Sequence, residues 1–156
     1  MRLHLCAVGR LRAGPERALV DDYVGRFNRM ARPLGFGALH EQEVEDRKGG
    51  GMAAEAELLV RALPPSCLLV VLDERGQQHT SPEFAARLAG WRDEGRAELA
   101  FVIGGSDGLA PTLRDKAHHA ISFGRMVWPH MLVRVMFAEQ IYRAATILSG
   151  SPYHRS

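Results

Sequence analysis

Short apolar runs alternate with segments of helical pattern along the whole chain of 156 residues. The helical segments are long enough to serve as the crossovers that parallel strands require, so this order predicts an α/β fold with a mostly parallel sheet flanked by helices. No linker and no internal repeat divides the chain, and a single domain over residues 1–156 is expected. The expected strands cover residues 3–8, a part of 35–44, 67–72, 99–103 and 120–123, and the expected helices cover 15–30, 52–63, 81–95, a short segment after 111, and 130–148.

Prolines mark the helix boundaries in this scheme. Pro15 suits the first turn of the first helix, and Ser81 is expected to cap the helix that Pro82 opens, because serine favours the N-cap and proline the position after it. The pair Pro64 and Pro65 ends the helix that precedes the third strand, since proline cannot continue a helix.

The composition is that of an ordinary globular protein, with 46% hydrophobic residues, 24% charged residues and a formal net charge of +2. These values exclude a disordered chain, and no apolar run approaches the roughly 20 residues that a membrane-spanning helix needs. The first residues lack the pattern of a signal peptide, so none is expected, and a cytoplasmic protein is predicted. Cys6 and Cys67 lie in apolar runs, where a reduced, buried thiol is expected rather than a disulfide or a metal ligand.

Three unusual loops follow three of the expected strands, and ligands bind beyond the carboxyl ends of strands in open α/β sheets. The loop after Leu72 holds Asp73 and Glu74 and is equally consistent with a solvated turn. The loop at 104–108, with the sequence GGSDG, permits close approach of a ligand or of another backbone because glycine has no Cβ. It is not the dinucleotide-binding fingerprint, because its glycine spacing differs and because it follows the fourth strand and not the first.

The third loop, residues 124–130 with the sequence GRMVWPH, is apolar and aromatic where a connecting loop is usually polar. An adenine-like ring would explain Met126 and Trp128, and so would a cap on the core or a dimer contact. The helix that follows is apolar on nearly every side, which indicates burial and favours a hydrophobic homodimer interface. Glu139 and Arg143 are expected to form an ion pair on its surface.

Four of the seven histidines lie in the last third of the chain. His118 and His119 lack partners at metal-ligand spacing, so no metal site is expected. His130 and Arg134 are four residues apart and share a helix face that begins at the third loop. His130 and His154 are therefore candidates for chemistry or for contact with an anion.

Four motifs occur in order in the second half of the chain: IGGSDG at 103–108, WPH with LVR at 128–134, EQIYRA at 139–144 and PYHR at 152–155. Together they resemble the RlmH family, which are SPOUT-class methyltransferases acting on pseudouridine in 23S ribosomal RNA. The segments AVGRL at 7–11 and YVGRF at 23–27 extend the resemblance over essentially the whole chain. Trp128 stands where Phe or Leu is common and Met131 where Pro or Gln is common, which affects the shape of the expected cofactor pocket.

The resemblance implies a SPOUT fold with a C-terminal trefoil knot, a homodimer, and S-adenosyl-L-methionine held by the knot loops without a metal. The cofactor-binding residues that it implies are Leu72, Gly104, Gly105, Gly124, Arg125, Met126, Val127, Trp128 and Pro129. The candidates on the substrate side are His130, Arg134, Tyr153, His154 and Arg155. Arg134 and Arg155 suit a contact with phosphate or with an imide oxygen.

The activity implied by the resemblance is methylation of N3 of a pseudouridine in helix 69 of 23S rRNA, at the position usually numbered 1915. N3 must lose its proton to attack the sulfonium methyl group, so the enzyme must align the reactants and assist that loss. A chain this small has little surface for reading RNA sequence, and the assembled ribosome, as large subunit or 70S particle, is the expected partner. The alternative is a non-catalytic module that binds the ribosome, which would need neither the glycine pair nor the apolar third loop.

Positive charge is concentrated at the two ends of the chain. Residues 1–32 carry seven basic and three acidic residues, residues 101–156 carry six and three, and the segments between them are net acidic. In a homodimer, the basic stretch of one subunit and that of its partner are expected to form one phosphate-binding surface.

Overall fold

Five parallel strands form one sheet in the order β2-β1-β4-β3-β5. The computed structural model describes residues 1–155. The strands are β1 (Arg2–Val8), β2 (Leu39–Val44), β3 (Leu68–Gln78), β4 (Glu98–Ile103) and β5 (His119–Ser122). The predicted parallel sheet is confirmed, and each expected strand is present, with small shifts at the ends of all but β3.

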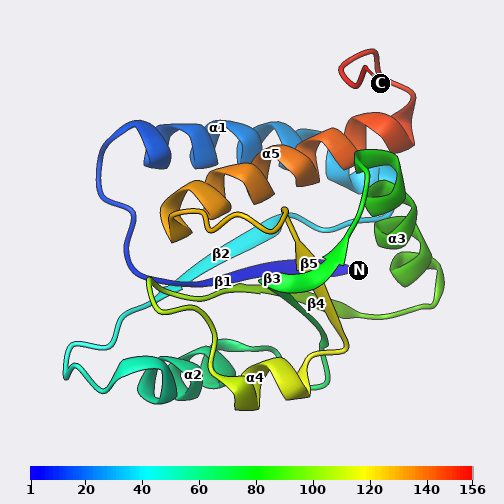
Figure 1. Cartoon of the computed structure of the whole chain (residues 1–156). Helices are drawn as coiled ribbons and strands as arrows, with labels where there is room; N and C mark the ends of the chain where they lie inside the picture. Colours follow the sequence, from blue (N-terminus) through cyan, green and yellow to red (C-terminus); the bar gives the residue numbers. More distant parts are fainter. Residues whose placement is uncertain (156) are drawn as a thin grey trace.

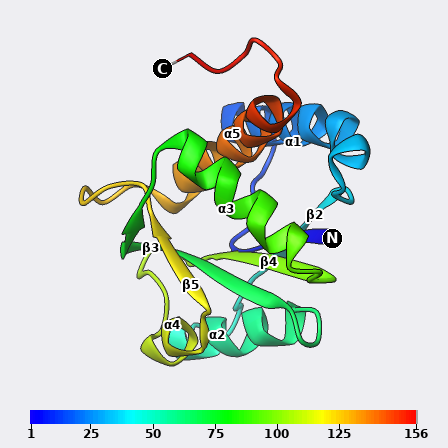
Figure 2. The ribbon, with the colours of Figure 1, turned by 90° about the vertical axis from the view of Figure 1, so that its right-hand side faces the viewer.

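The helices cover both faces of the sheet (Figure 1). On one face lie α1 (Pro15–Ala31), α3 (Ser81–Asp93) and α5 (His130–Ser149), and on the other lie α2 (Gly51–Ala62) and α4 (Pro111–Lys116), as the side view in Figure 2 also shows. A short 3-10 turn, η1 (Arg32–Leu34), follows α1. The two layers bury separate apolar clusters, with Leu3 and Phe101 in the first and Cys6 and Val102 in the second. The central strand β4 and the first half of β3 are nearly continuous apolar runs because both of their faces are covered, whereas the edge strand β2 is mostly polar.

Strand β3 extends beyond its predicted end at Leu72 and finishes at Gln78. After an irregularity between Leu72 and Gln77, it pairs with β5 a second time. A Cβ atom on Gly76 would lie 2.6 Å from the carbonyl carbon of Ala120, so this close approach requires glycine. The prediction of a loop directly after Leu72 was therefore wrong, because the second pairing depends on a contact between segments distant in sequence.

The N-cap of α3 is Thr80, and the prediction of Ser81 was wrong by one residue. The Thr80 hydroxyl accepts a hydrogen bond from the Glu83 backbone N–H, and the Glu83 carboxylate accepts one from the Thr80 N–H. This reciprocal pair is a capping box. Ser81 instead donates its hydroxyl proton to Gln140 Oε1 at 2.8 Å and so connects α3 with α5.

Helix α5 packs between α1 and α3 and is buried largely within its own chain. Phe137 and Ile141 belong to the main core. Exposed apolar side chains occur at the start of the helix and in the loop before it, and we call them the apolar patch: Met126, Val127, Trp128, Met131 and Leu132. Most of the helix is therefore covered by its own chain. The apolar patch is the part that a second chain would cover.

Both cysteines are free thiols, with Cys6 buried and Cys67 half-buried. Burial, together with the nearby Cys67, raises the pKa of the Cys6 thiol to about 11. Over residues 1–155, none of the helices combines the length and the apolar character needed to cross a membrane.

Candidate functional site

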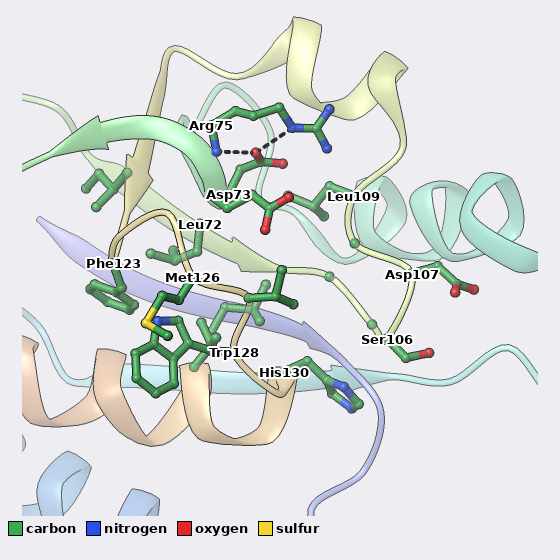
Figure 3. A pocket seen from close by; sticks show the side chains of 18 of the residues that line it. Leu72, Asp73, Arg75, Ser106, Asp107, Leu109, Phe123, Met126, Trp128 and His130 are labelled. Atoms are coloured by element: carbon green, nitrogen blue, oxygen red, sulfur yellow. Dashed lines mark hydrogen bonds and ion pairs between the residues drawn. The ribbon is translucent and has the colours of Figure 1, made fainter.

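A pocket lies at the carboxyl edge of β3, β4 and β5, where the three loops singled out from the sequence meet (Figure 3). In this view Phe123, Met126 and Trp128 line one side of the pocket, and Ser106 and Asp107 line the opposite side. All the expected cofactor residues except Arg125 and Pro129 line it. The three loops therefore form one site, as the rule for open parallel sheets predicts.

The glycine pair after β4 permits two close approaches within the protein. A Cβ atom on Gly104 would lie 2.7 Å from the carbonyl carbon of Gly108, and one on Gly105 would lie 3.0 Å from Glu55 Oε2 and from Val8 Cγ1. The loop also closes on itself through a 3.0 Å hydrogen bond from the Gly108 N–H to the Gly105 carbonyl oxygen. These glycines keep side chains out of the pocket and allow the loop to fold back beside it.

Residues 73–76 lie within β3, where its pairing with β5 is irregular, and they include two carboxylates with different surroundings. The Asp73 carboxylate accepts hydrogen bonds from the backbone N–H and the Nε of Arg75, at 2.8 Å and 3.2 Å, and lies 3.8 Å from Arg114 Nε (Figure 3). Asp73 is therefore held by its neighbours. Glu74 is exposed and, with Asp107, offers the pocket a carboxylate that forms no ion pair among the described residues.

A further acidic side chain, Glu55 of α2, lies beside Gly105. Burial raises its pKa, and the nearby carboxylates of Asp107 and Asp46 raise it further. The pocket is thus acidic on the side of the glycine loop.

The third loop, residues 124–130, is held by hydrogen bonds at its beginning and is exposed in its middle. The Ser122 hydroxyl lies within hydrogen-bond distance of the Glu74 and Gly124 carbonyl oxygens, at 3.1 Å and 2.9 Å, and it accepts a hydrogen bond from the Gly124 N–H. This links the first loop to the third. Met126 and Val127 are 73% and 81% exposed although they border the pocket.

The sequence did not point to five apolar residues that also line the pocket: Ile103, Leu109, Ile121, Phe123 and Val133. Phe123 and Val133 line it from the residue before Gly124 and from the first turn of α5. Both could have been predicted from their neighbours, because Phe123 precedes Gly124 and Val133 follows His130 at helical spacing.

His130 and Arg134 share a face of α5 but differ in their surroundings. His130 is half-buried and lines the pocket. Burial and, to a smaller extent, the charge of Arg134 lower the pKa of its imidazole and so favour the neutral form of the ring. Arg134 is only 1% exposed and is surrounded by protein groups, so it presents no N–H to the surface of this chain.

The C-terminal tail leaves α5 at the end opposite to His130 (Figure 1) and folds back against the middle of the helix, where neither Tyr153 nor His154 lines the pocket. The Tyr153 hydroxyl donates to Glu139 Oε1 at 3.1 Å, and Arg143 lies over the Tyr153 ring and within 3.2 Å of His154 Nδ1. The predicted pair of Glu139 and Arg143 is confirmed at 2.6 Å. Burial and the Glu139 carboxylate raise the pKa of Tyr153 to about 12.

These contacts hold Tyr153 and His154 away from the pocket of their own chain, and Arg155 is exposed beyond them. The structure therefore separates the expected substrate-side residues into two groups: His130 and Arg134 at the start of α5, and the tail, which packs further along the helix. Within the part of the chain that is described, no three His, Cys, Asp or Glu side chains are grouped so as to hold a metal ion.

Comparisons with known proteins agree with this architecture. The family model described as "Predicted SPOUT methyltransferase" matches residues 1–154. A protein of Cereibacter sphaeroides named "Ribosomal RNA large subunit methyltransferase H" is 70% identical over 155 residues, which cover 99% of each chain. A protein of Roseobacter denitrificans with the same name is 64% identical over 156 residues, which cover 100% of both chains.

Among solved structures, a probable methyltransferase from Bordetella pertussis Tohama I superposes with a TM-score of 0.51. The two chains share 16% sequence identity, and the match covers 92% of this chain and 96% of that one. At this identity the likeness concerns the fold alone. Together with the full-length relatives, these findings show that the chain belongs to the SPOUT methyltransferase family, within the group of the large-subunit ribosomal RNA methyltransferases H.

Proposed function

We propose that this protein transfers a methyl group from S-adenosyl-L-methionine to N3 of a pseudouridine in helix 69 of 23S rRNA, in the assembled ribosome of the cytoplasm. The observation that carries the proposal is the single pocket built by three strand-end loops in a chain whose full-length relatives are named as large-subunit rRNA methyltransferases. The trefoil knot expected for this family is part of the proposal.

The residues around the pocket fit a nucleoside with a charged side chain. Leu72, Met126 and Trp128 supply apolar surface for a purine ring, and Glu74 and Asp107 supply acceptors for hydroxyl or ammonium groups. When bound, S-adenosyl-L-methionine supplies a methyl group on a sulfonium centre. The chain's own contribution is to bind and orient this group.

His130 is the residue best placed to handle the proton of the substrate. Methylation forms an N–C bond at N3, breaks the S–C bond of the donor and releases the N3 proton. A neutral imidazole at the edge of the pocket accepts a proton or a hydrogen bond at that atom. Arg125 and Pro129 do not line the pocket, and we assign them to the outer part of the same loop.

A homodimer explains why the substrate-side residues are separated in one chain. The apolar patch lies at the start of α5, beside the pocket, and has no cover within residues 1–155. If a second copy covers this patch, its own tail can approach the pocket across the interface. We propose that Tyr153, His154 and Arg155 act there, on the pocket of the partner.

The carboxyl edge of the sheet also carries exposed basic residues that form no ion pair among the described residues. They lie in the loops after β1, β2 and β5: Arg10, Arg12, Lys48 and Arg125. Phosphate groups of RNA are the natural partners of such side chains at the border of a pocket.

Two measurements test the proposal and separate it from a non-catalytic ribosome-binding module. Isothermal titration calorimetry with S-adenosyl-L-methionine is expected to show binding, which the non-catalytic module does not require. Incubation with the radiolabelled methyl donor and either 70S particles, large subunits or free 23S rRNA is expected to label the assembled particles. Absence of label in all three substrates would overturn the proposal.

A further inference from the structure

Arg134 is the most completely buried charged side chain of the core, and its hydrogen bonds connect three elements. Its Nη1 donates to Glu41 Oε2 at 3.1 Å and to Glu43 Oε2 at 2.5 Å, both on β2. Its Nη2 donates to the carbonyl oxygens of Val8 and Gly9, at 3.3 Å and 2.8 Å, where β1 ends. The guanidinium therefore fixes the beginning of α5 to the carboxyl ends of β1 and β2.

The two glutamates extend this cluster to α1 and to the loop after β1. Arg17 of α1 forms an ion pair with Glu41, and its Nη1 lies 3.6 Å from Glu43 Oε2. Glu43 Oε2 also accepts a hydrogen bond from the Leu11 N–H at 2.7 Å. Burial opposes ionisation of Glu43, but the Leu11 N–H and the Arg134 guanidinium lower its pKa overall.

A buried ionic cluster of this kind is not required for stability. Apolar residues of similar volume often stabilise a core as well or better, because removing charges from water is costly. What such a cluster provides here is a fixed geometry, because the planar guanidinium donates its N–H groups in fixed directions. The geometry fixed here is that of the first turn of α5.

His130 lies in that turn, one helical turn before Arg134. Its Nε2 is 3.6 Å from the place where a Cβ on Gly9 would stand, and Gly9 is the residue whose carbonyl oxygen Arg134 holds at 2.8 Å. Gly9 therefore lies between the Arg134 guanidinium and the His130 ring. We expect a change at Arg134 to reach the His130 ring through the Gly9 loop and through the first turn of α5.

We propose that Arg134 and Glu43 are positioning residues that hold His130 at the edge of the cofactor pocket, and that neither of them contacts the RNA. The inference rests on the proposed function, and it replaces the phosphate contact expected for Arg134 from the sequence. Arg134 acts through Gly9 and the first turn of α5. Glu43 acts by holding the Arg134 guanidinium in place.

The test is a double-mutant cycle with His130→Ala and Arg134→Met, measured as methyl transfer to ribosomal particles. Arg134→Met is expected to lower kcat by about tenfold to a hundredfold, as for a small misplacement of a reacting group, with KM for the particles nearly unchanged. In the background of His130→Ala, the same change is expected to have little further effect. Arg134→Lys is expected to recover only part of kcat, since an ammonium group cannot form four hydrogen bonds in the plane of a guanidinium.

Arg92→Met is the matched control. Like Arg134, Arg92 donates a hydrogen bond to a backbone carbonyl oxygen, in this case that of Leu34, but it lies over the Phe36 ring and does not line the pocket. This variant is expected to leave kcat unchanged. Additive effects of His130→Ala and Arg134→Met, or a rise in KM without a fall in kcat, would overturn the inference. If Arg134→Met does not fold, Glu43→Gln replaces it in the same cycle.

A second readout does not depend on activity. The imidazole NMR signals of His130, assigned by comparison with His130→Ala, are expected to shift and broaden in Glu43→Gln and in Arg134→Lys but not in Arg92→Met. Unchanged signals in both cluster variants would contradict the positioning role. If the wild-type protein transfers no methyl group, the proposed function fails, and the NMR comparison still decides whether the cluster positions His130.

Discussion

Gly104 is the residue at which the pocket tolerates change least. A Cβ atom there would lie 2.7 Å from backbone atoms of Gly108, which cannot move aside as a side chain can. Gly104→Ala is expected to lower the free energy of unfolding by roughly 1–3 kcal/mol and to weaken binding of S-adenosyl-L-methionine by about tenfold or more. Chemical denaturation and calorimetry measure the two effects.

Gly90→Ala in α3 is the matched control for that change. No atom lies within 4 Å of a Cβ at this helical position, so alanine is expected to raise the free energy of unfolding by about 0.5–1 kcal/mol and to leave cofactor binding unchanged. Wild-type affinity in Gly104→Ala would contradict the described loop.

Glu43 makes the stability of the protein depend on pH. Its pKa in the folded protein is below the ordinary value of 4.5, so its ionised form stabilises the fold above that pH, and the stabilisation is lost as the pH falls further. Glu43→Gln is expected to lower the free energy of unfolding by about 1–3 kcal/mol at pH 7 and by much less well below pH 4.5. Urea denaturation at both pH values measures the difference, and a difference independent of pH would contradict the ionic role.

The burial of Arg134 could not be predicted from the sequence, although its position on the helix could. The spacing of His130 and Arg134 predicted a shared helix face, which the structure confirms, because spacing along a helix is a local property. It gave no sign that Arg134 is buried, since its partners Glu41 and Glu43 lie about ninety residues earlier in the chain.

At the scale of elements, the start of α3 depends on the capping box of Thr80. Thr80→Ala is expected to lower the free energy of unfolding by about 1 kcal/mol, because the Glu83 N–H loses its acceptor. Thr112→Ala, at an exposed position near the start of α4, serves as the control and is expected to change it by less than about 0.5 kcal/mol. Denaturant midpoints measure both, and equal values for Thr80→Ala and wild type would contradict the cap.

Most elements follow from the sequence because periodicity and turn residues are local signals. The uninterrupted apolar character of residues 99–103 was sufficient to place β4. The continuation of β3 was missed because Gly76 is a turn signal in isolation. Gly76 lies in a strand because β5 packs against it at Ala120, a residue distant in sequence.

At the scale of the whole molecule, we expect a homodimer that covers the apolar patch. Leu132→Glu places a charge at a patch residue that is 41% exposed and does not line the pocket. Sedimentation velocity is expected to show twice the chain mass of 17.2 kDa for the wild type and a folded monomer for this variant. Val60→Glu on α2, at a similarly exposed apolar residue, is expected to remain dimeric.

Periodicity and spacing specify which segments form strands, but not how the chain passes through its own loops. The trefoil knot is a property of that path and therefore stays a prediction from the family. The separation of the tail from the pocket is likewise a global property. Tyr153 and His130 both belong to motifs of one family, yet His130 begins α5 at the pocket and Tyr153 packs against Glu139 in the middle of that helix.

We propose that this chain methylates one nucleotide of 23S rRNA. The most direct measurement is mass-spectrometric mapping of rRNA from ribosomes that lack the modification, after incubation with the protein and S-adenosyl-L-methionine. The predicted result is a single added methyl group on N3 of a pseudouridine in helix 69, absent when Gly104→Ala replaces the wild type. Methylation at another nucleotide, or none, would contradict the account.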